Sequence, residues 1–218
     1  MVRLEDETPV LVAAVGVRGI HVTPDQAPFS ELLLCAAHYR DRYSGQPIGS
    51  IPGVEPARRF FHAIGLDPTK RRPSSEALLN RALKEKPLYS INTLVDICNW
   101  CSLDFLLPIG LYDLDKISGE VIIRRGRLNE SYLALNDQVL NLLDRYVLAD
   151  AQGPFGSPMT DSQRTAVTLE TSRALTVVFA PEAYDREILQ QQAELYAKRI
   201  VQFCGGDLSL LRLVPDPR

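Results

Sequence analysis

The sequence has no apolar stretch long enough to cross a membrane and no basic leader ahead of a hydrophobic segment. Its longest unbroken apolar run is Pro9–Val15, whereas a membrane-spanning helix needs about 20 residues. Three carboxylates lie at residues 5–7, where a signal peptide carries positive charge. These features of the 218-residue chain predict a soluble, cytoplasmic protein.

Cysteine is scarce, with four in the whole chain. Cys98 and Cys101 form a C-x-x-C pair, which is typical of a redox site or of half a zinc site. Structural zinc takes four ligands, and the sequence offers neither a second cysteine pair nor a spaced histidine pair. We therefore expect reduced, buried thiols, and neither a metal nor another cofactor.

The formal net charge of −3 gives the whole chain no general attraction for nucleic acid. The charge is unevenly spread, however, because residues 58–86 carry eight Lys and Arg against three acidic residues. Lys70, Arg71 and Arg72 lie in this segment, and Arg124 and Arg125 begin a second basic cluster. Either cluster is compatible with a solvated helix face. Together they are also compatible with a phosphate-contacting surface.

Hydrophobic periodicity and turn residues predict helices first, strands next and a closing helix. The expected helices span residues 29–43, 56–64, 74–84, 91–105, with Ser90 as a cap, and 182–204. The expected strands span residues 10–15, with 17–22 as a continuation, 106–112, 120–124, 132–135, 146–149, 165–169 and 175–180. This order predicts an α+β fold, a single compact domain over residues 1–218 with a mixed β-sheet flanked by helices.

Short polar side chains recur along the 91–105 helix, at Asn92, Asp96 and Asn99. This stripe lies opposite an apolar face and contains neither Lys nor Glu. It therefore suits a tightly bonded site, although most polar stripes are simply solvated.

Two further features sit near the end of the strand region. The Gly-rich stretch 153–158 predicts either a plain turn or a loop whose N–H groups meet an anion or a carbonyl oxygen. Glu170 ends the expected strand 165–169, on the face opposite Leu169. It is either a solvated carboxylate or an acceptor and candidate base in a pocket.

Three ordered motifs, LVDICNW at 94–100, PIGLYD at 108–113 and D-K-I-x-G at 115–119, resemble the tRNA-editing domain of the phenylalanyl-tRNA synthetase beta subunit. Residues 67–79 are similar to the free-standing branch of that family, and the resemblance runs from about residue 40 to 180. It implies a compact α+β domain with a pocket between helix and sheet. It also implies a trans-acting hydrolase that removes an amino acid from mischarged tRNA.

The resemblance also implies roles for individual residues. It gives catalytic roles to Asn99, Gly153 and Gly156, and substrate-binding positions to Glu170, Cys98 and Gly110. It implies ester hydrolysis without a covalent intermediate, with the glycine loop stabilising the oxyanion. The acceptor end of tRNA would meet Lys70, Arg71 and Arg72, or Arg124 and Arg125.

The sequence departs from the family at two pocket positions. Cys98 stands where the synthetases commonly have Thr, and Gly110 stands where they commonly have His. The loss of an imidazole at residue 110 predicts a wider pocket whose amino-acid preference cannot be carried over. The synthetase's catalytic-like core and anticodon-binding module have no counterpart here, so the chain is not expected to be a ligase by itself. A non-catalytic RNA- or amino-acid-binding module and a protein-interaction scaffold remain as alternatives.

Overall fold

The computed structural model describes residues 2–5 and 8–216. Its α-helices are α1 (Ala27–Tyr43), α2 (Glu55–Ala63), α3 (Ser74–Leu83), α4 (Thr93–Phe105) and α5 (Arg186–Cys204). Its strands are β1 (Val2–Leu4), β2 (Val10–Arg18), β3 (Ile109–Asp113), β4 (Val121–Arg125), β5 (Ser131–Leu133), β6 (Val139–Asn141), β7 (Tyr146–Asp150), β8 (Gly153–Gly156), β9 (Arg173–Pro181) and β10 (Asp207–Val214). Short 3-10 turns lie at residues 48–50, 114–116 and 163–165.

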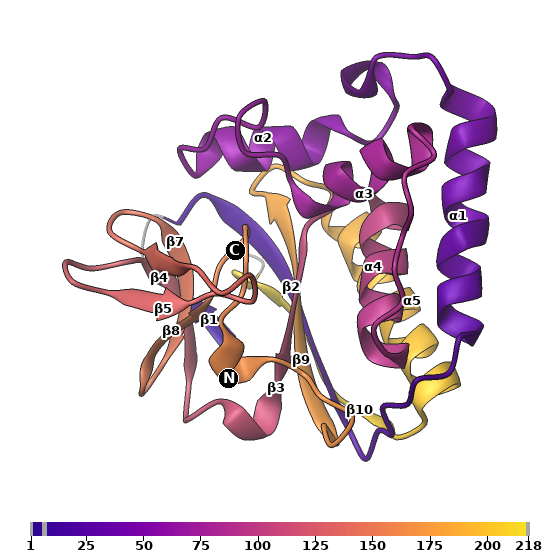
Figure 1. The fold of residues 1–218 in the computed structure, drawn as a ribbon. Helices are drawn as coiled ribbons and strands as arrows, with labels where there is room; N and C mark the ends of the chain where they lie inside the picture. The colour runs from indigo at the N-terminus through magenta and orange to yellow at the C-terminus, as the bar shows by residue number, and fades with distance from the viewer. Residues whose placement is uncertain (1, 6–7, 217–218) are drawn as a thin grey trace.

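The strands form two four-stranded sheets and one ribbon. The central sheet has the order β10-β2-β9-β3 and is antiparallel throughout. The second sheet has the order β1-β4-β7-β8, in which β1 is parallel to β4 and the other pairs are antiparallel. In Figure 1 the second sheet lies to the left of the central sheet, helices α1, α3, α4 and α5 lie to the right of the central sheet, and α2 lies above the two sheets.

Strand β2 explains this layering, because it is apolar and buried on both faces from Val10 to Val17, and only its last residue, Arg18, is exposed. Leu11, Ala13 and Val15 pack into one core with α4 and α5, whereas Val10 and Val12 pack into another core with the second sheet. Successive residues of a strand point to opposite faces, so this strand needs a cover on each side. The second core also receives α2, where the Phe60 ring stacks on Phe179 of β9 with the ring centroids 5.7 Å apart.

The structure confirms the predicted α+β class but corrects several elements. The apolar strands form two sheets rather than one, and β10, which the sequence analysis did not anticipate, pairs with β2. Helix α4 begins at Thr93, and its cap is Asn92, whose Oδ1 accepts from the Val95 N–H at 3.0 Å, not Ser90.

The expected strand 165–169 is wrong. The segment leaves a 3-10 turn at Thr165 and runs as an irregular connection. Side chains, rather than a neighbouring strand, satisfy polar groups along it. The Lys116 ammonium donates to the Ala166 carbonyl at 2.6 Å, and the Thr168 N–H donates to the Thr171 hydroxyl at 2.9 Å.

The basic connection between α2 and α3 is held by one buried carboxylate. Glu76 of α3 is 2% exposed and accepts two hydrogen bonds from Arg58 of α2, at 2.7 and 2.8 Å. Arg72 adds a third contact at 3.3 Å. This ion cluster ties the two helices together and fixes the end of the connection that carries Lys70 and Arg71.

We expect Glu76→Ala to lower the free energy of unfolding by about 3–5 kcal/mol, because it leaves the partly buried Arg58 guanidinium without its acceptor. Glu55→Ala is the matched control, since Glu55 pairs with Arg59 on the surface of α2. Its cost should stay below about 1 kcal/mol. Urea unfolding followed by circular dichroism measures both. Equal losses in the two variants would contradict a supporting role for the buried carboxylate.

Candidate functional site

Tyr112 of β3 is fully buried, and its hydroxyl donates a hydrogen bond to Asp161 Oδ1 at 2.8 Å. Two glycines flank this phenol. A Cβ on Gly156 of β8 would come 2.5 Å from the Tyr112 hydroxyl oxygen, and one on Gly110 would come 2.8 Å from the ring carbon Cζ. Either side chain would overlap the tyrosine, so both glycines leave room for it. Gly110 and Gly156 therefore both lie against the Tyr112 ring.

The structure corrects the wider pocket expected at Gly110. Residues 110 and 112 are two apart on one strand, so their side chains share a face. The Tyr112 phenol occupies the space where a side chain of residue 110 would begin. The space beside Gly110 is therefore filled by the Tyr112 ring of the same strand.

Asp161 has an unusual carboxylate. Burial raises its pKa to about 7, against the opposing effect of the Tyr112 hydroxyl and the Ser157 N–H, which both donate to it. The segment that carries Asp161 is fixed, because the Ser157 hydroxyl and the Tyr132 hydroxyl both donate to the Thr160 carbonyl, at 2.8 and 2.6 Å. The residue remains partly exposed. A carboxylate that titrates near neutral pH is suited to accept a proton.

Helix α4 brings Cys98 near Asp161, and Asn99 follows it on the same helix. Cys98 is 8% exposed, and burial, together with the charge of Asp161, raises the pKa of its thiol to about 12. It is therefore a neutral thiol rather than a nucleophile near pH 7. Asn99 is half-buried, and its side chain makes no hydrogen bond to any residue that the structure describes. Asp96, by contrast, is fully buried and holds the helix start, accepting from the Ser90 hydroxyl at 2.6 Å and the Ile91 N–H at 3.0 Å.

Gly153 and Glu170 are not brought to this cluster. The expected Gly-rich loop is strand β8, where Gly153 pairs with Asp150 of β7 at the end remote from Gly156. Its carbonyl accepts from Arg164 at 3.2 Å. Glu170 lies in an exposed turn, where its N–H donates to the Thr168 hydroxyl at 3.2 Å.

The basic residues separate into free and engaged groups. Lys70 and Arg71 are exposed on the α2–α3 connection, whereas Arg72 contacts Glu76. Arg124 is 5% exposed and forms a bidentate pair with Glu130 at 2.7 and 2.8 Å. Its predicted role in phosphate contact is contradicted, because the guanidinium is buried and its charge is already balanced.

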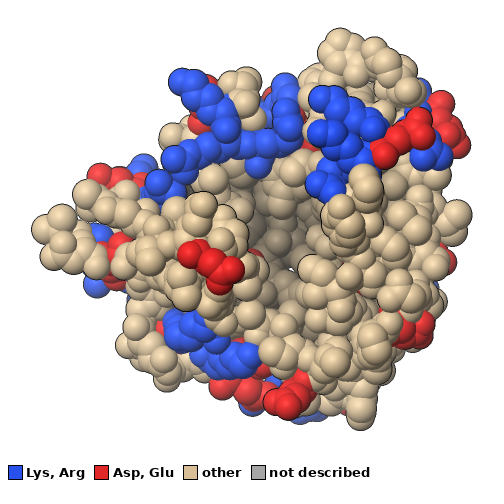
Figure 2. Space-filling view, viewed as in Figure 1, with Lys and Arg blue, Asp and Glu red and all other residues tan. Residues whose placement is uncertain are grey.

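Arg125 is exposed, but its guanidinium already contacts other residues. It donates to the Asp144 carbonyl at 2.9 Å and lies over the Tyr146 ring, 4.6 Å from its centroid. Figure 2 shows Lys and Arg side chains gathered along the upper rim of a central hollow, which lies between the second sheet and the helices. The face thus presents positive charge beside a concave surface despite the net charge of −3.

The sequence analysis did not single out Tyr112 or Asp161. One signal was available, because Gly110 and Tyr112 occupy neighbouring positions on one face of β3. The partner carboxylate lies 49 residues further on, and its approach to Tyr112 depends on the tertiary fold.

Among residues 2–5 and 8–216, no group of three or more His, Cys, Asp or Glu side chains could hold a metal ion. No helix in that part of the chain combines the length and the apolar character that a membrane span requires. Cys98 and Cys101 are both buried free thiols.

Residues 56–204, from α2 to the end of α5, match the model of the B3/4 domain. The chain is 27% identical over 184 residues to a phenylalanine–tRNA ligase beta subunit from Cutibacterium acnes, which covers 77% of this chain and 22% of that protein. It is 30% identical over 166 residues to the Bartonella henselae subunit, covering 65% of this chain and 21% of that protein.

The fold is also similar to an N-terminal fragment of the phenylalanyl-tRNA synthetase beta subunit from Pyrococcus horikoshii, with a TM-score of 0.48 and 13% identity over 99% of this chain and 54% of the fragment. The chain spans only 22% and 21% of the two bacterial ligase subunits. The domain model, however, covers well over half of the chain. The protein therefore belongs to the B3/4 domain family.

Proposed function

We propose that the protein hydrolyses the aminoacyl ester of mischarged tRNA in trans. The observation that carries this proposal is the Asp161 carboxylate, which accepts a hydrogen bond from Tyr112 and whose pKa burial raises to about 7. Its setting is a domain whose relatives are phenylalanine–tRNA ligase beta subunits. No ligase activity is proposed, because the chain covers about a fifth of those subunits.

In the proposed reaction Asp161 accepts a proton from a water molecule, whose oxygen attacks the ester carbonyl carbon. The carbonyl oxygen becomes an oxyanion, and the unpartnered Asn99 amide donates a hydrogen bond to it. The bond between the former carbonyl carbon and the ribose oxygen then breaks, and the oxyanion becomes a carbonyl again. The proton held by Asp161 passes to the departing ribose oxygen. Aminoacyl esters are activated, so positioning and a modest base suffice. The family-implied roles of Gly153 and Gly156 stay predictions, with Gly156 the nearer to Asp161.

Tyr112 also bears on which amino acid is accepted. Its phenol fills the space above Gly110 and Gly156. A substrate side chain would therefore find this space already filled. We propose that esters of small amino acids are preferred over those of tyrosine. Lys70 and Arg71 would contact the acceptor end, and the net charge of −3 makes this binding weak and salt-sensitive.

Deacylation assays on a panel of tRNAs charged with small, aliphatic and aromatic amino acids test the function. We expect faster release of small amino acids than of tyrosine, because the Tyr112 ring occupies the larger space. Release from no member of the panel would reject the hydrolase. If tRNA binding were retained in that case, the non-catalytic binding module would be the correct reading.

Replacement of Asp161 tests the proposed base. We expect Asp161→Asn to lower kcat/KM at least about 100-fold, the usual contribution of a general base. In the parent, kcat/KM should rise with pH around a midpoint near 7, because the carboxylate accepts a proton only when ionised. Glu170→Gln is the comparison, since it removes the exposed carboxylate that the sequence offered as a candidate base and to which the resemblance gave a substrate-binding position. A loss confined to Glu170→Gln would assign the role to that residue instead.

The Tyr112→Phe variant tests whether Asp161 acts as a base or has only a structural role. The Tyr112 hydroxyl stabilises the ionised form of Asp161, so its removal should raise the pKa of Asp161 further. The midpoint of the pH–rate profile should move to higher pH, while the rate on the alkaline plateau is kept. The profile of hydrolysis against pH measures this shift. An unmoved midpoint with an equal loss at every pH would argue against proton transfer to Asp161.

A further inference from the structure

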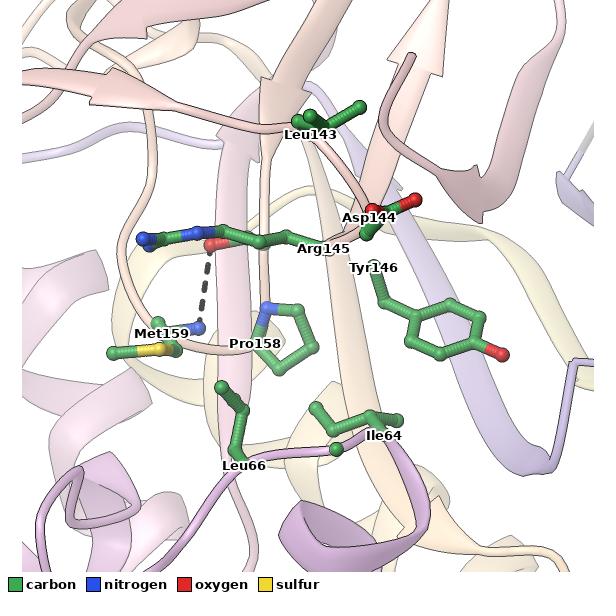
Figure 3. A pocket seen from close by; sticks show the side chains of 10 residues that line it. Ile64, Leu66, Leu143, Asp144, Arg145, Tyr146, Pro158 and Met159 are labelled. Carbon is green, nitrogen blue, oxygen red and sulfur yellow. Dashed lines mark hydrogen bonds between the residues drawn. The ribbon is translucent and has the colours of Figure 1, made fainter. Parts of the chain in front are cut away.

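A small pocket of about 110 Å³ lies beside the Asp161 segment, between the end of α2, the turn that enters β7 and the residues after β8 (Figure 3). Apolar side chains form much of its wall, namely Ile64, Leu66, Leu143, Tyr146, Pro158 and Met159. It adjoins the proposed site through Ser157, whose N–H donates to Asp161. None of the steps proposed above uses this pocket.

Arg145 is the unusual side chain of this pocket. In Figure 3 its guanidinium extends above Met159. The Nη1 atom is buried and has no hydrogen-bond partner among the residues that the structure describes. Burial, and after it the positive charge of Arg71, lowers the pKa of Arg145. A buried cationic donor without an acceptor is costly, and an anion would remove that cost.

Arg71 brings a second cation to the same place. It is exposed, and its Nη1 lies 3.8 Å from the Met159 sulfur, which is a weak acceptor. Neither Arg71 nor Arg145 forms an ion pair within residues 2–5 and 8–216. Asp144 also lines the pocket, but Figure 3 shows its carboxylate at the other end from the Arg145 guanidinium.

We propose that Arg145 and Arg71 together bind a phosphate group at this pocket. Two neighbouring guanidinium groups repel each other, and the attraction of both groups to a multiply charged anion between them would offset this repulsion. Their planar N–H donors match phosphate oxygens in pairs. The phosphate has two candidate sources, a backbone phosphate of RNA or a free phosphomonoester. Only the first rests on the proposed function.

Binding experiments with Arg145→Gln and Arg71→Gln test this site. Arg42→Gln is the matched control, because it removes an exposed arginine from α1. The probes are uncharged tRNA over a range of salt concentrations and adenosine 5′-monophosphate, with adenosine as the phosphate-free comparison. Uncharged tRNA keeps the measurement independent of ester hydrolysis, so failure of the deacylation assay leaves this test intact.

We expect both pocket variants to lose at least about tenfold in affinity for a phosphate-bearing probe, while Arg42→Gln binds like the parent. For tRNA, the slope of log K against log salt should fall by about 0.7–0.9 for each phosphate contact removed. A loss confined to tRNA identifies a backbone phosphate, and one confined to the nucleotide identifies a free phosphomonoester.

Stability gives an independent reading. Arg145→Gln should melt no lower than the parent, because it removes an unpaired buried donor. Arg71 is exposed, so Arg71→Gln should remain folded. Its binding measurements therefore still test the proposal if Arg145→Gln unfolds. The proposal is overturned if the parent binds neither probe, if both variants bind like the parent, or if adenosine competes as well as its monophosphate.

Discussion

Burial of the central sheet on both faces is the constraint on which the remaining architecture depends. Strands β2 and β9 expose almost nothing, so one face requires α4 and α5 and the other requires the second sheet. This arrangement leaves β3 as an edge strand of the central sheet. Helix α4, strand β8 and the segment before β9 meet at this edge. Polar groups there are partly buried but lie outside the apolar core.

The cluster at that edge depends on two positions that carry no side chain as well as on the side chains that are present. Gly110 and Gly156 carry none, and the Tyr112 ring fills the resulting space and directs its hydroxyl to Asp161. Burial raises the pKa of that carboxylate, and the hydrogen bond opposes the shift without cancelling it. The balance between these two effects leaves the pKa of Asp161 at about 7.

The arginines illustrate how tertiary contacts decide the use of a charge. Arg124 is neutralised by Glu130 inside the second sheet, and Arg72 shares Glu76 with Arg58. Arg145 lies in a chain segment with no basic run, yet its buried Nη1 has no partner in the described structure. A basic cluster in the sequence is therefore a poor guide to free positive charge, because pairing depends on carboxylates that are distant in the sequence.

The sequence by itself determined the α+β class, the positions of the helices and the family resemblance, because apolar periodicity and short motifs are local properties. It also identified Cys98, Gly110 and Gly156, which the fold places around one phenol and carboxylate. The tertiary structure alone decided that residues 165–169 form no strand, that Glu170 faces solvent and that Asp161 meets Tyr112. These outcomes depend on which distant segments become neighbours, and no local pattern of side chains encodes that choice.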